Sequence, residues 1–145
     1  MCDSLARKVN RRDTDSMSIS IVRLGQKRRA GEGVRIGTVR RPPRGVPKAE
    51  WSKRDILDVW LPNLAPSEEL LKTGLAVQTD AQWRTFARRY MAEMKKPENS
   101  RVLDTLAALS HDASFSMGCY CEDESRCHRS VLRKLLAERG ADIAS

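Results

Sequence analysis

The order in which apolar patterns follow one another is the feature that most limits how this chain can fold. Residues 19–24 and 34–39 carry short apolar patterns typical of strands, on either side of a glycine-rich basic loop. Helical spacing dominates residues 67–109, and an alternating strand pattern at 114–120 precedes a helical one at 131–136. This order predicts an α/β fold: a single domain with a small, mainly parallel sheet flanked by helices.

Capping and helix-breaking residues set the expected helix boundaries. Ser67, followed by two acidic residues, predicts the start of a short helix. Asp80 predicts the start of a longer helix, which Pro97 closes. A third helix is expected to begin at Asn99 or Ser100.

The chain of 145 residues has the length of one domain. Residues 1–16 are polar and without periodicity, so we expect a disordered tail, or a true start of translation at Met17, before a domain spanning residues 17–145. No apolar run approaches the roughly 18 residues of a membrane span, and the N-terminus carries no apolar signal segment. We therefore expect a cytoplasmic protein with reduced cysteines and no membrane partner.

Positive charge is concentrated in one segment. The formal net charge is +8, and residues 17–48 hold nine basic side chains against Glu32 alone. Such a segment favours an anionic partner, either a phosphorylated or carboxylate small molecule or a nucleic acid. A solvated basic surface is the alternative interpretation, because residues 17–48 lack the aromatic side chains on which single strands stack.

The end of this basic segment is rich in proline. Pro42, Pro43 and Pro47 lie within six residues and exclude both a helix and a central strand. An irregular loop carrying Arg40, Arg41 and Arg44 is therefore expected after the second predicted strand. We refer to residues 40–47 as the proline loop.

The segment with the most chemistry is 118–129, Gly-Cys-Tyr-Cys-Glu-Asp-Glu-Ser-Arg-Cys-His-Arg, which runs from a predicted strand into a predicted helix. Ligand sites of α/β folds form beyond the carboxyl ends of strands. Cys127 is expected in the cap or first turn of the helix, beside Arg126, His128 and Arg129. Free N–H groups and nearby cations lower the pKa of a thiol and make it a nucleophile. Whether the protein is an enzyme stays open at this point.

Two other interpretations of the same segment remain. Cys119, Cys121, Cys127 and His128 are ligand types for tetrahedral zinc, so a zinc-stabilised module is an alternative. We expect no metal or other cofactor, because Cys-x-Cys differs from the common Cys-x2-Cys zinc knuckle. The cysteines can also simply be packed side chains, and the Cys-x5-Arg cradle of cysteine phosphatases is absent.

Several motifs occur together in a consistent order. They are residues 40–46 (Arg-Arg-Pro-Pro-Arg-Gly-Val), residues 58–67 (Asp-Val-Trp-Leu-Pro-Asn-Leu-Ala-Pro-Ser), Trp83, Phe86, Arg89, Tyr90, Glu93, Cys119, Cys121 and the Cys-His-Arg run 127–129. The combination resembles the YeaO-like proteins of the domain-of-unknown-function family 488, over roughly residues 19–138. This resemblance implies a small cytosolic bacterial α/β protein without an established activity.

The two loops are expected to meet. If the strands before them are parallel neighbours, both loops leave the sheet at one edge and form an anion pocket, in which guanidinium groups bind phosphate or carboxylate. The candidate residues are Cys127 and His128 as the catalytic pair, Arg40, Arg41, Arg44 and Arg129 as anion ligands, and Asp58, Ser67, Tyr90, Cys119 and Cys121 as supporting residues. Asp58 and Ser67 are expected to orient the arginines, and Tyr90 to pack beneath the pocket.

Overall fold

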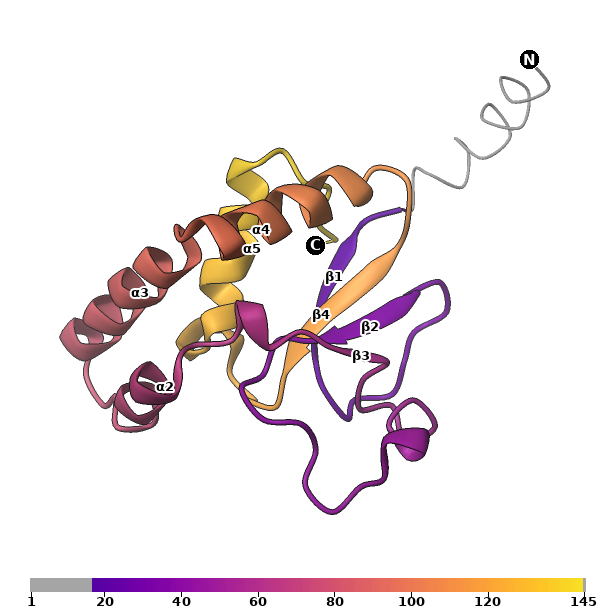
Figure 1. The fold of residues 1–145 in the computed structure, drawn as a ribbon, viewed down its shortest axis with the longest axis horizontal. Coiled ribbons are helices and arrows are strands. Elements are labelled where there is room, and N and C mark those ends of the chain that lie inside the picture. Colours follow the sequence, from indigo (N-terminus) through magenta and orange to yellow (C-terminus); the bar gives the residue numbers. More distant parts are fainter. Residues whose placement is uncertain (1–16, 145) are drawn as a thin grey trace.

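The fold is a small parallel sheet with helices packed against one face. The computed structural model describes residues 17–144, so the prediction about residues 1–16 lies outside the described part of the chain. Its strands are β1 (Ile19–Arg23), β2 (Val34–Gly37), β3 (Val59–Trp60) and β4 (Phe115–Cys119). They form one sheet in the order β1-β4-β2-β3, and every pairing between them is parallel (Figure 1). The predicted α/β class with a small parallel sheet is confirmed.

Helices α3, α4 and α5 gather on one side of this sheet (Figure 1). The helices are α2 (Glu68–Leu75), α3 (Asp80–Met94), α4 (Pro97–Leu109) and α5 (His128–Glu138), and the short 3-10 turns are η1 (Lys48–Glu50), η2 (Pro62–Leu64) and η3 (Glu124–Arg126). Two boundaries differ from the prediction. Thr79 rather than Asp80 caps α3, through a reciprocal pair of hydrogen bonds with Gln82. Pro97 begins α4 instead of only closing α3, because a first helical residue needs no N–H group.

The main core lies between the sheet and these helices. Met117 from the central strand β4 is fully buried, as are Tyr90 of α3 and Leu132 of α5, and all three belong to one apolar cluster. The Tyr90 hydroxyl donates a hydrogen bond of 2.5 Å to the carbonyl oxygen of Leu64. Burying this large ring with its polar end satisfied contributes stability without an unpaired hydroxyl group.

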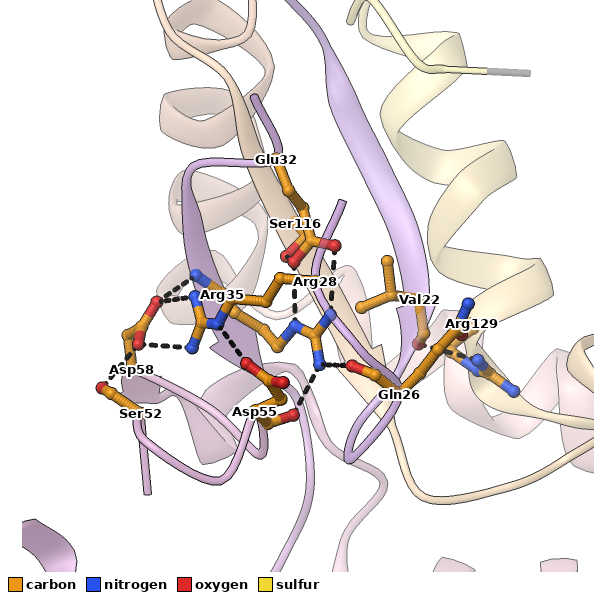
Figure 2. Close-up of polar contacts among 10 residues, drawn as sticks. All are labelled: Val22, Gln26, Arg28, Glu32, Arg35, Ser52, Asp55, Asp58, Ser116 and Arg129. Carbon is orange, nitrogen blue, oxygen red and sulfur yellow. Dashed lines mark hydrogen bonds and ion pairs between the residues drawn. The ribbon is translucent and has the colours of Figure 1, made fainter. Parts of the chain in front are cut away.

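Loops cover the other face of the sheet, and a buried pair of charged side chains lies beneath them. Arg35 and Ser116 pair in register on β2 and β4, and they point away from the neighbouring Ile36 and Met117 of the main core. The Arg35 side chain is fully buried and makes two hydrogen bonds, of 2.8 and 3.0 Å, with the carboxylate of Glu32. Ser116 Oγ donates to the same carboxylate at 2.9 Å (Figure 2). A buried ion pair is tolerated when its remaining polar atoms are also paired.

A second arginine, Arg28, links the loops that cover this ion pair. Arg28 makes two hydrogen bonds to the carboxylate of Asp58, at 2.7 and 2.6 Å, and a third at 3.1 Å to Asp55 (Figure 2). Asp58 also accepts the backbone N–H of Arg35 at 2.8 Å. Hydrogen bonds from Arg28 in particular hold the pKa of Asp58 well below its usual range. Part of the positive charge in residues 17–48 is thus neutralised inside the molecule.

Candidate functional site

The parallel pairing of β2 and β4 brings the proline loop and the cysteine segment to one edge of the sheet. Gly37 at the end of β2 lies opposite Gly118 near the end of β4. The next residue, Thr38, donates its backbone N–H to the carbonyl oxygen of Gly118 at 2.9 Å. The chain after each strand therefore leaves the sheet in the same direction. Cys119 ends β4, and Cys127 is the N-cap residue of α5.

Three sulfur atoms meet at this edge. The Sγ atoms of Cys119, Cys121 and Cys127 all lie within 4.8 Å of one another. Cys119 and Cys121 are in direct contact, with 3.7 Å between their sulfurs. Cys119 and Cys127 are buried, whereas Cys121 is exposed, and all three are free thiols. We call these three residues the thiol cluster.

The surroundings of the thiol cluster lower the pKa of Cys127 and raise the pKa of the other two thiols. Contacts from the Cys119 and Cys121 thiols, followed by His128, hold the pKa of Cys127 well below that of an ordinary thiol. The pKa of Cys119 is raised, mainly by its contacts with the other two thiols. The pKa of Cys121 is raised as well: its contact with Cys119 lowers it, but Cys127 and burial outweigh that effect.

His128 is oriented by the end of β2. Its Nε2 lies 2.7 Å from the backbone carbonyl oxygen of Thr38 and 3.2 Å from Thr38 Oγ1. A carbonyl oxygen accepts only, so Nε2 carries a proton. The other ring nitrogen, Nδ1, lies 3.7 Å from Cys127 Sγ. The edge of the His128 ring contacts Tyr90, with 5.4 Å between ring centroids. Tyr90 thus packs against the histidine from within the core.

Arg129 ties the thiol cluster to the sheet. Its Nε donates to Cys127 Sγ at 3.4 Å, its Nη1 to the carbonyl oxygen of Val22 at 2.7 Å, and its Nη2 to that of Cys121 at 2.6 Å. Figure 2 shows this guanidinium beside the Val22 carbonyl. The side chain is buried, and it is absent from the cavity lining described below. Its position makes it a partner of the Cys127 sulfur and of two backbone carbonyls.

A cavity of about 360 Å³ opens over Cys127 and His128. Arg40, Arg41, Lys72 and Arg126 supply four basic side chains to its lining, against the single acid Glu68. The remaining lining residues are mostly apolar or small: Val39, Pro66, Leu71, Gly74, Leu75, Phe86, Cys119, Tyr120 and Cys121. This cavity suits an anion with an apolar body, and its size is typical of a small-molecule site.

The three arginines of the proline loop have different surroundings. Arg40 donates to the carbonyl oxygens of Pro66, Pro62 and Ala65, at 2.9 to 3.2 Å, and so holds the turn before α2. Arg41 is exposed and forms an ion pair of 2.9 Å with Glu68 at the cavity rim. Arg44 is also exposed but lines a separate surface hollow. Two of the three expected arginines therefore reach the cavity.

The polar supporting residues lie elsewhere. Asp58 binds Arg28, as described above. The Ser67 side chain caps α2 and donates to Glu93 at 2.5 Å. Among the hydrogen bonds of residues 17–144, neither side chain reaches an arginine of the proline loop. Asp58 and Ser67 are expected to orient the pocket arginines, but their partners are Arg28 and Glu93.

Two residues of the site were not foreseen. Thr38 orients His128, and the available signal was a polar side chain at the end of an apolar strand pattern. Lys72 lies one helical turn after Glu68 on α2, and this spacing places both side chains at the cavity rim.

The nucleic-acid hypothesis concerned the basic segment as a whole. Arg28 and Arg35 are bound to acids and Arg40 to carbonyl groups. Lys27, Arg29, Arg44 and Lys48 are exposed, and so are Arg23 and Arg41, which form surface ion pairs with Glu122 and Glu68. The hypothesis stays a prediction, and it now depends on this smaller set of side chains.

The thiol cluster can also hold a metal ion. A zinc ion bound tetrahedrally at about 2.3 Å separates its sulfur ligands by roughly 3.8 Å. The contact of 3.7 Å between Cys119 and Cys121 matches that separation. Within the described residues, the grouping of possible ligand atoms contains the three sulfurs and leaves out His128.

These features define a small α/β protein with a thiol cluster beneath a basic-rimmed cavity. Residues 19–140 match the family described as "Active DUF488-N3 subclade". The chain belongs to the DUF488 family, which confirms the resemblance seen in its motifs. No curated protein and no solved structure matches it. No helix among residues 17–144 is long and apolar enough to cross a membrane.

Proposed function

We propose that this protein binds a small anionic molecule in the cavity over Cys127 and that the Cys127 sulfur attacks it as a nucleophile. The observation that carries the proposal is the placement of Cys127. Its sulfur accepts a hydrogen bond from Arg129 Nε, faces His128 Nδ1 and lies at a helix N-terminus, all at the base of one cavity. These are the surroundings that keep a thiol ionised at neutral pH.

His128 supplies the proton chemistry. With Nε2 donating to Thr38, Nδ1 is the atom that exchanges a proton with the Cys127 sulfur or with a leaving group. Arg129 keeps the thiolate in place by donating to it and to the neighbouring backbone. Nucleophile, proton carrier and orienting group thus stand next to one another in the sequence, at positions 127–129.

The cavity rim binds the anionic end of the ligand. Arg41, Lys72 and Arg126 contribute three cations whose side chains are exposed or at the rim. Arg41 pairs with Glu68 and Arg126 with Asp80, and all four side chains are largely exposed. Exposed ion pairs are screened by solvent, so a ligand anion can replace the acid as the arginine's partner. Arg40 holds backbone carbonyls and shapes the cavity wall.

Alkylation with two related reagents tests this proposal. Iodoacetate is an anion and iodoacetamide is its neutral analogue. In the wild-type chain Cys127 should react fastest of the three cluster thiols, and Arg41→Gln should reduce the ratio of the iodoacetate rate to the iodoacetamide rate several-fold. Arg44→Gln is the matched control, since it removes a proline-loop arginine outside the cavity and should leave the ratio unchanged. A Cys127 no faster than Cys119 and Cys121, or equal ratios in the two variants, would refute the proposal.

A metal centre is a second candidate function, favoured by the 3.7 Å separation of the Cys119 and Cys121 sulfurs. In that case Cys119, Cys121 and Cys127 would supply three thiolate ligands to a zinc ion. Titration of the reduced chain with zinc, followed by alkylation, separates the two candidates. One zinc ion per chain that protects all three thiols supports the metal centre. Alkylation of Cys127 at the same rate with and without zinc supports the nucleophile.

A further inference from the structure

Cys127 and His128 are sufficient for the proposed nucleophilic attack, and yet a further thiol, the exposed Cys121, lies beside Cys127. We propose that Cys121 resolves a mixed disulfide formed at Cys127, so that the site reduces small anionic disulfides by thiol–disulfide exchange. This inference rests on the proposed function of Cys127 and names the substrate class and a second reacting residue.

The position of Cys121 suits a resolving thiol. Its sulfur lies within 4.8 Å of Cys127 Sγ, and its side chain is exposed on the loop between β4 and α5. Arg129 binds the carbonyl oxygen of Cys121 at 2.6 Å and the sulfur of Cys127 at 3.4 Å. One guanidinium therefore holds the Cys121 backbone next to the Cys127 sulfur.

Cys119 is the other possible partner, and its backbone argues against it. Cys119 is the last residue of the central strand, and its carbonyl oxygen accepts the N–H of Leu24 at 2.9 Å. A disulfide needs its two sulfurs about 2.05 Å apart, so one of the cysteines must move. A residue on the connecting loop accommodates that shift more readily than one held in the sheet. The expected protein disulfide is therefore Cys121 to Cys127.

Thiol–disulfide exchange at this pair of cysteines takes two steps. First, the Cys127 thiolate attacks one sulfur of the substrate, the substrate S–S bond breaks, a mixed disulfide forms, and the first thiolate leaves and takes up a proton. Next, Cys121 loses its proton and its sulfur attacks Cys127 Sγ, which breaks the bond to the substrate and releases the second thiolate, which is protonated in turn. Overall the substrate gains two electrons and becomes two thiols, while Cys121 and Cys127 are oxidised to a disulfide. A dithiol reductant returns the pair to the starting state.

The cavity indicates which disulfides enter. Four basic side chains line it above the cysteines, and its volume of about 360 Å³ admits a small molecule rather than a folded protein. Carboxylate groups on the substrate pair with the basic rim, and the apolar walls contact the carbon chain next to the disulfide. A low-molecular-weight disulfide bearing carboxylates combines these properties.

Glutathione disulfide serves as the probe, with intact-mass and peptide mapping of the full-length chain as readouts. The wild-type chain should release two glutathione molecules and form the Cys121–Cys127 disulfide. Cys121→Ser should stop after the first step, with glutathione attached to Cys127 and its release at least tenfold slower. Cys119→Ser should still form the Cys121–Cys127 disulfide, at a reduced rate because it removes one of the three thiols of the cluster. Circular dichroism of each variant checks that it is folded.

The outcomes separate the two proposals. If Cys127 forms the adduct but Cys121→Ser releases it as fast as the wild type, or if the mapped disulfide contains Cys119, Cys121 is not the resolving thiol and the nucleophile proposal stands. If folded wild-type and Cys121→Ser chains form no adduct on Cys127 and Cys127 is also slow toward iodoacetamide, both proposals fail. If Cys127 reacts with iodoacetamide but not with glutathione disulfide, the disulfide-exchange proposal is overturned and the nucleophile proposal stands.

Discussion

His128 Nε2 lies 2.7 Å from the backbone carbonyl oxygen of Thr38, and this contact decides which ring nitrogen faces the thiol cluster. Since the carbonyl oxygen accepts the Nε2 proton, Nδ1 is left toward Cys127 Sγ at 3.7 Å. The residue that orients the histidine is 90 positions away in the sequence and belongs to a neighbouring strand end. The proton chemistry of the Cys-His-Arg run therefore depends on the pairing of β2 with β4.

This contact predicts the effect of replacing His128. His128→Gln keeps a donor in reach of the Thr38 carbonyl but removes the nitrogen that faces Cys127. The pH midpoint for alkylation of Cys127 should therefore rise toward the ordinary thiol value of about 8.5. Thr38→Val is the matched control, because it removes only the hydroxyl and keeps the backbone carbonyl, and it should cause a smaller rise. An unchanged midpoint in folded His128→Gln would show that the ring does not act on the thiol.

Arg129 should contribute strongly to stability. Arg129→Met leaves the buried carbonyl oxygen of Val22 and the part-buried one of Cys121 without this donor, at about 1–3 kcal/mol for a fully buried group. We expect urea unfolding to show a loss of about 2–5 kcal/mol. Arg133→Met, one turn later on α5, removes a half-exposed ion pair with Glu124 and should cost less than about 1 kcal/mol. Equal losses in the two variants would contradict the role given to Arg129.

Stability should fall in acid because of two internal carboxylates. Hydrogen bonds from Arg28 lower the pKa of Asp58, and those from Arg35 and Ser116 lower that of Glu32 against the opposing effect of burial. A carboxyl group whose pKa is lower in the folded chain than in the unfolded chain stabilises the fold at any pH above its unfolded-state pKa, which is near 4. This stability is lost as the pH falls through the folded-state pKa. Urea unfolding from pH 6 downward should therefore show the free energy of unfolding decreasing below about pH 4. Asp58→Asn should flatten this dependence, whereas Glu138→Gln, at an exposed helix end, should leave it as in the wild type.

Two glycines with the same backbone angle provide a test of the loop packing. Gly31 and Gly33 both have φ of +79°, but a Cβ atom on Gly33 would lie 1.9 Å from the carbonyl oxygen of Ser114, whereas one on Gly31 meets nothing within 4 Å. Gly31→Ala should cost about 1 kcal/mol, the ordinary penalty for this conformation. Gly33→Ala should cost clearly more, because the loop that carries Glu32 must move away from β4. Thermal unfolding of the two variants measures the difference, and equal melting temperatures would contradict the close approach.

Local patterns predicted most of the elements. The apolar spacing around Phe86 and Tyr90 indicated α3, and the alternation through Phe115 and Met117 indicated β4. Both patterns are visible because an element buried on one face has apolar residues at regular intervals along the sequence. Helix starts were less accurate: Thr79 and Pro97 were missed. At α3, Thr79 and Asp80 compete for the same free N–H groups, so only the folded backbone shows which one is the cap. At α4, a proline is compatible both with ending one helix and with beginning the next.

The sequence by itself determined the class of fold, the family and the position of the cysteine segment between a strand and a helix. The tertiary structure decided what each charged or polar side chain does. Arg129, an expected anion ligand, is buried against backbone carbonyls, and Arg35, one of the nine basic residues of the 17–48 segment, is buried against Glu32. Lys72, on a separate helix, lines the cavity instead. The physical reason is that a helix or strand with one buried face carries apolar residues at regular intervals, which can be read from the local sequence. The partner of a charged side chain, in contrast, comes from a distant segment that only the packed fold brings into contact with it.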